Sequence, residues 1–217
     1  MTSFFENLIS TFPAFMEAAW MTLRLTGVSL VLAFVIGLVF ALLKVTGVRW
    51  LGLLYNGYVG IIRGTPLIVQ IMWLYFGITQ IVVLSAFWAG TIALAIHSGA
   101  YIAEIFRGCI QSVEKGQMEA AESLGMKRAL AMRRVILPQA LKRAIPPLGN
   151  QFIIGLKDSS LVAFIGITEI FSLSMDNAAV TFKQLEFYTI AGLYYLAMVT
   201  IVTFVLSRVE NRMDTAK

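Results

Sequence analysis

Charged residues are scarce in this sequence. Only 13% of its 217 residues are Asp, Glu, Lys or Arg, whereas 59% are hydrophobic and the mean hydropathy is +0.81. An ordinary soluble domain carries roughly 25% charged residues, so this composition excludes a protein whose main solvent is water. Because a helical crossing needs about 20 apolar residues, the length allows roughly four to six crossings with short loops. No room is left for a separate soluble domain.

Cysteine and histidine each occur once, as Cys109 and His97. A lone cysteine excludes an internal disulfide, and Cys109 has no cluster of metal ligands near it in the sequence. We therefore expect no bound metal, and we interpret Cys109 as an ordinary small apolar residue.

Two signals of other protein classes are missing. Residues 1–15 contain no Lys or Arg, so they lack the basic region of a cleaved secretory signal, and the first span is expected to stay in the mature protein. No GxxxxGK[ST] phosphate loop occurs, so this chain is not expected to bind ATP itself.

Long apolar runs predict an all-α integral membrane protein, a single transmembrane domain over 1–217 with five transmembrane helices. We expect spans at about 25–43, 55–83, 86–106, 144–165 and 187–206. Residues 13–24 suit an amphipathic helix at the interface, before the chain turns into the membrane. Pro66 lacks a backbone donor, which predicts a kink near the start of the second span. The fourth span is expected to open with Pro146-Pro147.

Basic residues predict the orientation of these spans, because Lys and Arg gather in cytoplasmic loops. Five spans place the two termini on opposite sides. Most of the 17 basic residues then fall on one side, leaving only Arg24, Lys157 and Lys183. Those on the common side are Lys44, Arg49, Arg63, Arg107, Lys115, Lys127, Arg128, Arg133, Arg134, Lys142, Arg143, Arg208, Arg212 and Lys217. The N-terminus is therefore predicted outside and the C-terminus in the cytoplasm.

The longest polar stretch, about 108–143, is the cytoplasmic loop between spans three and four. Within it we predict a short helix that Gly116 starts, with Glu119 in its favourable first turn. Ala120 and Ala121 would allow close approach of another surface, and Gly125 would end the helix in a left-handed conformation. Such a short helix is not stable alone, so it is expected to pack against something. An amphipathic surface helix within a loop fits the same pattern.

Several stretches resemble one family over nearly the whole chain. Glu119-Ala120-Ala121, then Gly125, then the run 135–140 are similar to the EAA loop of bacterial ABC-importer permeases. Other stretches resemble the histidine/glutamine-type branch for polar amino acids, and its glutamine permeases in particular. These are Arg63-Gly64-Thr65-Pro66, Ser98 to Ile105 with Arg107-Gly108, Pro146 to Gln151, and Lys157 to Leu161. Asp158-Ser159-Ser160 stands where Asp-Thr-Ser is expected, which keeps a hydroxyl.

The resemblance implies a non-catalytic permease subunit that carries polar amino acids inward, with glutamine the first choice. In that family the EAA helix inserts into a cleft of the ATP-hydrolysing subunit. Coupling would therefore run through the loop at about 112–130, with Glu119, Ala120, Ala121 and Gly125 as docking residues. The implied partners are two ATPase subunits holding ATP and Mg, a second permease, and an external amino-acid-binding protein. We expect the second permease to be an identical chain, although a different permease chain fits the sequence too. The implied location is a bacterial inner membrane.

Ionisable residues within the spans are candidates for the substrate pathway, because charge in a bilayer is costly unless it is paired or faces water. Lys157 and Asp158 could bind the carboxylate and ammonium of a zwitterionic amino acid, but a structural ion pair to another span fits them equally. His97, Tyr101 and Glu104 follow at i, i+4 and i+7 and so share one helix face. They could line the pathway or form bonds between helices.

Arg63 and Thr65 are further pathway candidates. Arg63 is expected near the cytoplasmic end of span two, where it could also be a positive-inside anchor.

Other functional classes remain open at this point. A secondary transporter or channel would need its own gating or ion-coupling site and would have no use for an EAA helix. A serine hydrolase built on His97-Ser98 is disfavoured, because adjacent helical residues do not face each other and no third orienting group is evident.

Overall fold

The computed structural model describes residues 4–214, without the side chains of residues 209 and 212–214. Every regular element in this range is a helix, as predicted. The elements are α1 (Phe4–Ser10), α2 (Phe12–Val45), α3 (Arg49–Gly64), α4 (Leu67–Met72), η1 (Trp73–Gly77), α5 (Ala86–Gln111), α6 (Lys115–Ser123), α7 (Arg128–Ala131), η2 (Met132–Ile136), α8 (Leu137–Asp158), η3 (Ser159–Ile165), α9 (Ile170–Thr181) and α10 (Gln184–Asp214). Of these, η1 and η2 are π-helical and η3 is a 3-10 helix.

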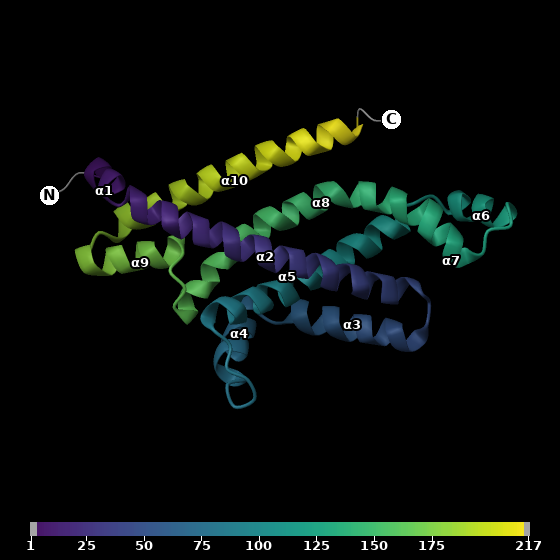
Figure 1. Cartoon of the computed structure of the whole chain (residues 1–217), viewed down its shortest axis with the longest axis horizontal. Coiled ribbons are helices and arrows are strands. Elements are labelled where there is room, and N and C mark those ends of the chain that lie inside the picture. The colour runs from purple at the N-terminus through teal and green to yellow at the C-terminus, as the bar shows by residue number, and fades with distance from the viewer. Residues whose placement is uncertain (1–3, 215–217) are drawn as a thin grey trace.

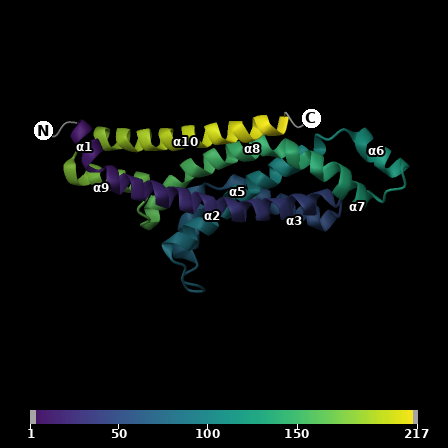
Figure 2. The same cartoon turned by 45° about the horizontal axis from the view of Figure 1, so that its top comes forward.

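Four long helices form the body of the molecule. α2 packs against α5, α5 against α8, and α8 against α10. All four run along the long axis of the molecule (Figures 1 and 2). One end of this bundle holds α1, α9 and the start of α10, and the other end holds the α2–α3 turn, α6 and α7 (Figure 1).

Small side chains let α2 lie close to its neighbours. Its buried small residues recur every three or four positions, on one helix face, at Thr22, Thr26, Ser29, Ala33, Gly37 and Ala41. A Cβ at Gly37 would lie only 2.5 Å from Cγ2 of Ile102 on α5. Membrane helices associate through this kind of close packing, since lipid gives no hydrophobic drive between them.

The first span differs from the prediction. α2 is unbroken from Phe12 to Val45, so the separate interfacial helix expected at 13–24 is wrong. Pro13 lies in the first turn, where its missing N–H breaks no helical hydrogen bond. Phe15 and Ala18 are buried in a cluster with residues of α9 and α10, so this segment continues the bundle.

The break predicted at Pro66 is confirmed. The axis of α3 and that of the helix formed by α4 and η1 meet at 104°. Thr65, which precedes the proline, has the extended backbone that a following proline favours (φ −121°, ψ 143°). The helical segment that contains the predicted second span begins earlier than expected, at Arg49, and ends at Gly77. The segment formed by α4 and η1 protrudes sideways from the bundle (Figure 1).

The helix of the predicted third span starts where it was expected, whereas the helix of the predicted fourth span does not. α5 begins at Ala86, as predicted, and continues past residue 106. α8 begins at Leu137, so the prediction that Pro146-Pro147 opens this helix is wrong. The two prolines leave the carbonyls of Lys142 and Arg143 without helical donors, and both of those residues are exposed to water.

The segment between η3 and α10 contains a helix, α9, that the sequence did not indicate. Its N-cap, Glu169, is fully buried and accepts hydrogen bonds from the Ser172 N–H at 2.7 Å and the Tyr195 hydroxyl at 2.5 Å. Burial raises the pKa of the Glu169 carboxyl. These bonds tie α9 to α10, which is longer at both ends than the predicted span at 187–206.

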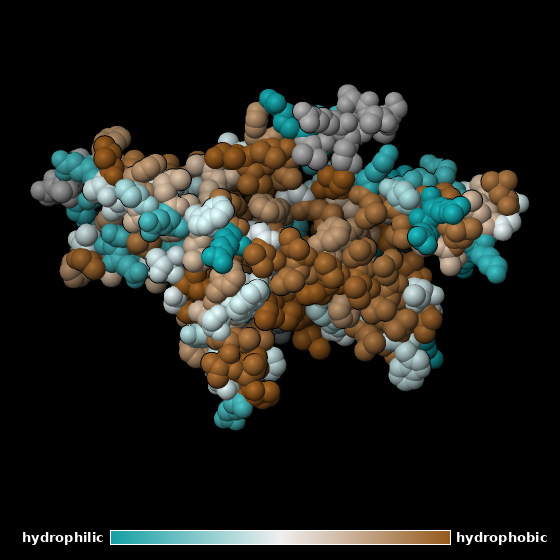
Figure 3. Space-filling model, in the orientation of Figure 1, coloured by the Kyte–Doolittle hydropathy of each residue, from teal (hydrophilic) through white to brown (hydrophobic). Residues whose placement is uncertain are grey.

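Length and apolarity single out three helices in the described part of the chain that could cross a membrane: α2, α5 and the 184–208 part of α10. The bent pair of α3 with α4 and η1 could be a fourth. α8 is not among them, so five spans stay a prediction. Apolar residues cover the middle of the face in Figure 3, and polar residues gather towards its two ends. Val35 and Leu196, at 56% and 63% exposure, contribute to the apolar surface.

Candidate functional site

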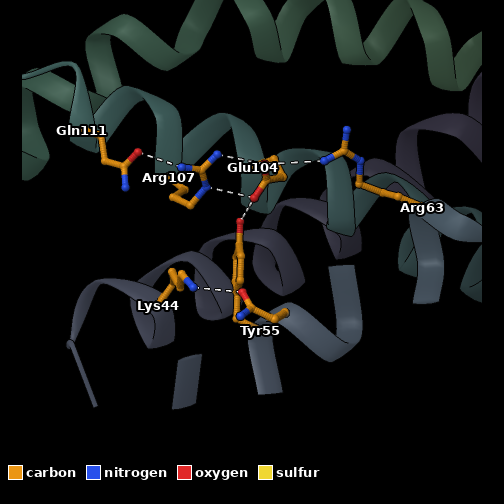
Figure 4. Close-up of polar contacts among 7 residues, drawn as sticks. Lys44, Tyr55, Arg63, Glu104, Arg107 and Gln111 are labelled. Atoms are coloured by element: carbon orange, nitrogen blue, oxygen red, sulfur yellow. Dashed lines mark hydrogen bonds and ion pairs between the residues drawn. The ribbon is translucent and has the colours of Figure 1, made fainter. Parts of the chain in front are cut away.

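A carboxylate within the bundle binds two arginines and a tyrosine. Glu104 of α5 accepts hydrogen bonds from Nε and Nη2 of Arg107, both at 2.9 Å. The hydroxyl of Tyr55, on α3, donates to the same carboxylate, and Nη1 of Arg63 lies 3.5 Å from Oε2. Figure 4 shows these donors converging on Glu104 from α3 and α5. The charge of Glu104 is therefore compensated within the protein, as an intramembrane charge requires.

Arg63 does not lie where the sequence placed it. It belongs to the last turn of α3, whereas the α2–α3 turn adjoins the first turn of that helix. At 1.5 Å per residue, Arg63 is roughly 20 Å from that turn, so it lies away from the end of the span that is predicted to be cytoplasmic. Its guanidinium lies 5.2 Å from the centre of the Tyr101 ring and pairs with Glu104.

The shared face predicted for His97, Tyr101 and Glu104 is confirmed. The rings of His97 and Tyr101 are 5.2 Å apart, and Arg63 links Tyr101 to Glu104. Nδ1 of His97 also lies 3.2 Å from Oε1 of Gln70 on α4. His97 therefore bonds between helices, which is one of its two predicted roles.

Gln70 is a residue of this region that the sequence interpretation missed. Its Nε2 donates to the Ile62 carbonyl at 2.9 Å and to Oγ1 of Thr65 at 2.8 Å, which caps the open end of α3 at the break. Thr65 takes part in this cap and does not line the cavity described next. The only signal in the sequence was an amide within an otherwise apolar run, 67–77.

A cavity of about 250 Å³ lies between α5 and α8 and is lined by His97, Tyr101, Gln151, Ile154 and Asp158. No Lys or Arg in the described part of the chain lies within 4.0 Å of the Asp158 carboxylate, so the structural ion pair considered for it is not formed there. The cavity offers a carboxylate that can accept from an ammonium group, and amide and phenol groups that can donate to a carboxylate.

Lys157 and Asp158, both predicted as pathway residues, point in different directions from α8. Asp158 is partly buried and lines the cavity, whereas Lys157 is exposed and does not line it. Adjacent helical residues point about 100° apart, which accounts for the difference. Within the described residues, no group of three or more His, Cys, Asp or Glu could hold a metal ion.

The short helix predicted in the loop is α6, and its C-terminal end has the predicted form. Gly125 is left-handed (φ +82°). Its N–H bonds to the Glu122 carbonyl at 2.9 Å, and the Met126 N–H bonds to the Ala121 carbonyl at 3.1 Å. These two bonds form a Schellman motif, which needs a residue in this conformation and so favours glycine.

The N-terminal half of α6 differs from the prediction. The helix begins at Lys115, so Glu119 lies in its second turn and not in the first. Glu119 and Ala120 are exposed, whereas Ala121 is buried against the chain itself. Leu124, with 82% of its side chain exposed, is a surface residue that sequence reasoning missed.

Side-chain packing attaches α6 to the bundle. Met118 packs against a cluster that contains Ile110 from the end of α5 and Ala140 from the start of α8. Nε2 of Gln139, on α8, donates to Oε1 of Gln117 at 3.3 Å. A displacement of α6 would therefore be passed to both α5 and α8.

A family model matches residues 9–215, described as a binding-protein-dependent transport system inner membrane component. The chain is 38% identical to the glutamine transport system permease protein of Escherichia coli (strain K12), over 93% of both chains. It is 35% identical to the arginine transport system permease protein of Bacillus subtilis (strain 168), over 97% of both.

Among solved structures, one titled an amino acid ABC transporter with histidines matches with a TM-score of 0.91 and 41% identity. The match covers 98% of this chain and 100% of the other.

Proposed function

Because this chain belongs to the family of inner-membrane components of binding-protein-dependent transport systems, we propose that it forms the membrane pathway of an ATP-driven importer that moves polar amino acids inward. The observation that carries the proposal is α6, a short capped helix at one end of the bundle. Glu119 of this helix and Leu124 directly after it are exposed, while Ala121 and Met118 hold the helix against the protein. Exposed residues on an attached helix suit docking to a second subunit.

Transmission to the membrane would run through α8. This helix starts next to α6, at Leu137, and ends at Asp158 in the cavity. At 1.5 Å per residue, it connects the two ends over roughly 30 Å. A partner that moves α6 can therefore change the space between α5 and α8, where the substrate would pass.

The cavity chemistry suits an amino acid. Asp158 would accept hydrogen bonds from the substrate ammonium, and Gln151 and Tyr101 would donate to its carboxylate. Glutamine is our first choice of substrate. Since the relatives named above transport glutamine and arginine, the side chain that is accepted has to be measured.

The chain would pair with an identical second permease and with two ATPase subunits that bind ATP and Mg and hydrolyse the ATP. An external binding protein would deliver the substrate. α8 would be the fourth of five spans in a bacterial inner membrane, with the N-terminus outside and the C-terminus in the cytoplasm.

The test is transport by the reconstituted complex. The chain is co-purified with its ATPase, placed in lipid vesicles and supplied with binding protein, and uptake of labelled glutamine, arginine and histidine is measured. We expect uptake of a polar amino acid that requires ATP and binding protein, and a hydrolysis-deficient ATPase serves as the control. Uptake driven by an ion gradient without the ATPase would instead establish a secondary transporter.

A further inference from the structure

The turn between α2 and α3 forms a basic pocket remote from the amino-acid cavity. α2 ends at Val45, Gly47 reverses the chain in a left-handed conformation (φ +77°), and α3 begins at Arg49. A pocket of about 350 Å³ lies in this turn, and its only charged lining residues are Lys44 and Arg49.

Lys44 and Arg49 lack a counter-charge. Neither lies within 4.0 Å of a carboxylate in the portion of the chain that the structure describes. Nζ of Lys44 donates to Oδ1 of Asn56 at 2.9 Å and lies 5.3 Å from the centre of the Tyr55 ring, so its position is set by neutral groups. Glu104 lies at the opposite, hydroxyl end of that ring and is already occupied by arginines (Figure 4).

The surroundings of this pocket are typical of the edge of a bilayer. It joins the ends of two segments that are long and apolar enough to belong to membrane spans. Around it, Trp50, Leu53 and Leu54 expose 77%, 51% and 60% of their surface. Tryptophan is enriched where hydrocarbon meets headgroups, so the exposed Trp50 favours a position of the two cations at the depth of lipid phosphates.

We propose that this pocket binds the phosphate of an anionic phospholipid headgroup. Arg49 offers a planar set of donors that matches phosphate oxygens, and Lys44 adds a point charge beside it. The exposed Leu53 would contact the acyl chains of the same lipid. Basic pockets between membrane helices suit anionic headgroups in this way. The proposal does not depend on which substrate is transported.

Two kinds of variant test the site. Lys44→Gln with Arg49→Gln removes the charges, and Gly52→Leu fills the pocket while all charges stay. A Cβ at Gly52 meets only Nζ of Lys44, at 4.0 Å, and leucine favours helix more than glycine does, so this variant should fold. Lys142→Gln with Arg208→Gln is the matched control, because it removes two exposed positive charges predicted to lie on the same side.

The measurement is lipid binding to the purified, detergent-solubilised complex by native mass spectrometry and by thermal shift. The probes are phosphatidylglycerol, phosphatidylcholine with the same acyl chains, and inorganic phosphate. We expect phosphatidylglycerol to bind and raise the unfolding temperature, and phosphatidylcholine and phosphate at equal concentration to have no such effect. Both test variants should bind phosphatidylglycerol roughly tenfold more weakly. The first loses two cations that contribute near an anionic lipid, and Gly52→Leu fills the space of the headgroup. The control should bind as the parent does.

Three results would overturn the proposal. The first is equal loss of binding in the control, which would mean a diffuse effect of net charge. The second is unchanged binding in the Lys44 and Arg49 variant or in Gly52→Leu. The third is an equal effect of inorganic phosphate, which would mean a site for free anions and not for lipid.

Discussion

At the scale of single residues, Asp158 is the side chain on which the proposed substrate site depends. It lines the cavity without a cation partner, so its charge is available to an incoming ammonium group. We predict that Asp158→Asn lowers the apparent affinity for substrate about tenfold or more, because a hydrogen bond to a charged group contributes about 1.5–3 kcal/mol. Uptake in vesicles measures this, and complex assembly and basal ATP hydrolysis should stay intact.

The neighbouring residue gives the control for that experiment. Lys157→Gln changes a charge one position away, but Lys157 is exposed outside the cavity and should alter uptake by less than about twofold. An Asp158→Asn protein that fails to insert or to bind its ATPase would show that the carboxylate is structural, and the substrate assignment would then be wrong.

At the scale of elements, the left-handed end of α6 aims the chain that leaves the proposed docking helix. Gly125→Val places a β-branched residue at φ +82°, which costs roughly 1–2 kcal/mol and redirects the chain. We predict normal membrane insertion and loss of most transport, through weaker ATPase binding or through hydrolysis that no longer responds to substrate. Pull-down of the ATPase and hydrolysis with and without loaded binding protein measure the two effects.

Gly116 provides the comparison within the same helix. It has no positive φ, and a Cβ there would meet nothing within 4 Å, so Gly116→Ala should transport normally. Normal docking, hydrolysis and uptake in Gly125→Val would remove α6 from the coupling path.

A second prediction at this scale concerns the close contact between α2 and α5. Gly37→Ala inserts a methyl group where Ile102 already lies 2.5 Å from the Cβ position, and such overpacking costs typically about 1–3 kcal/mol. We expect a lower unfolding temperature in thermal scans of the purified protein. Gly27→Ala, on the same helix with nothing within 4 Å, should show no loss. Equal stability of the two variants would mean that α2 and α5 are not held at this distance.

At the scale of the whole molecule, the orientation in the membrane is testable at exposed sites on opposite ends. In a Cys109→Ala background, Val180→Cys and Leu124→Cys create thiols at positions that are 81% and 82% exposed. We predict that an impermeant thiol reagent added to intact cells labels residue 180, and that residue 124 reacts only after permeabilisation. The permease is expressed without its ATPase, so that docking does not shield residue 124. The reverse pattern would invert the proposed topology.

The sequence alone determined the helical membrane class, the break at Pro66, the glycine that ends α6 and the shared face of His97, Tyr101 and Glu104. Each of these depends on local chemistry, namely apolar length, a missing backbone donor, a left-handed conformation or helical periodicity.

Only the tertiary structure decided which residues meet across helices. It showed that Arg63 pairs with Glu104 and that Gln70 contacts His97. It also showed that Asp158 lines a cavity, whereas Lys157 is exposed outside it. It also showed that Ala121 is buried and that Pro146 and Pro147 lie inside α8. These outcomes depend on where a helix begins and on what packs against it, and side chains distant in sequence supply that information. A pattern read along one chain does not contain it.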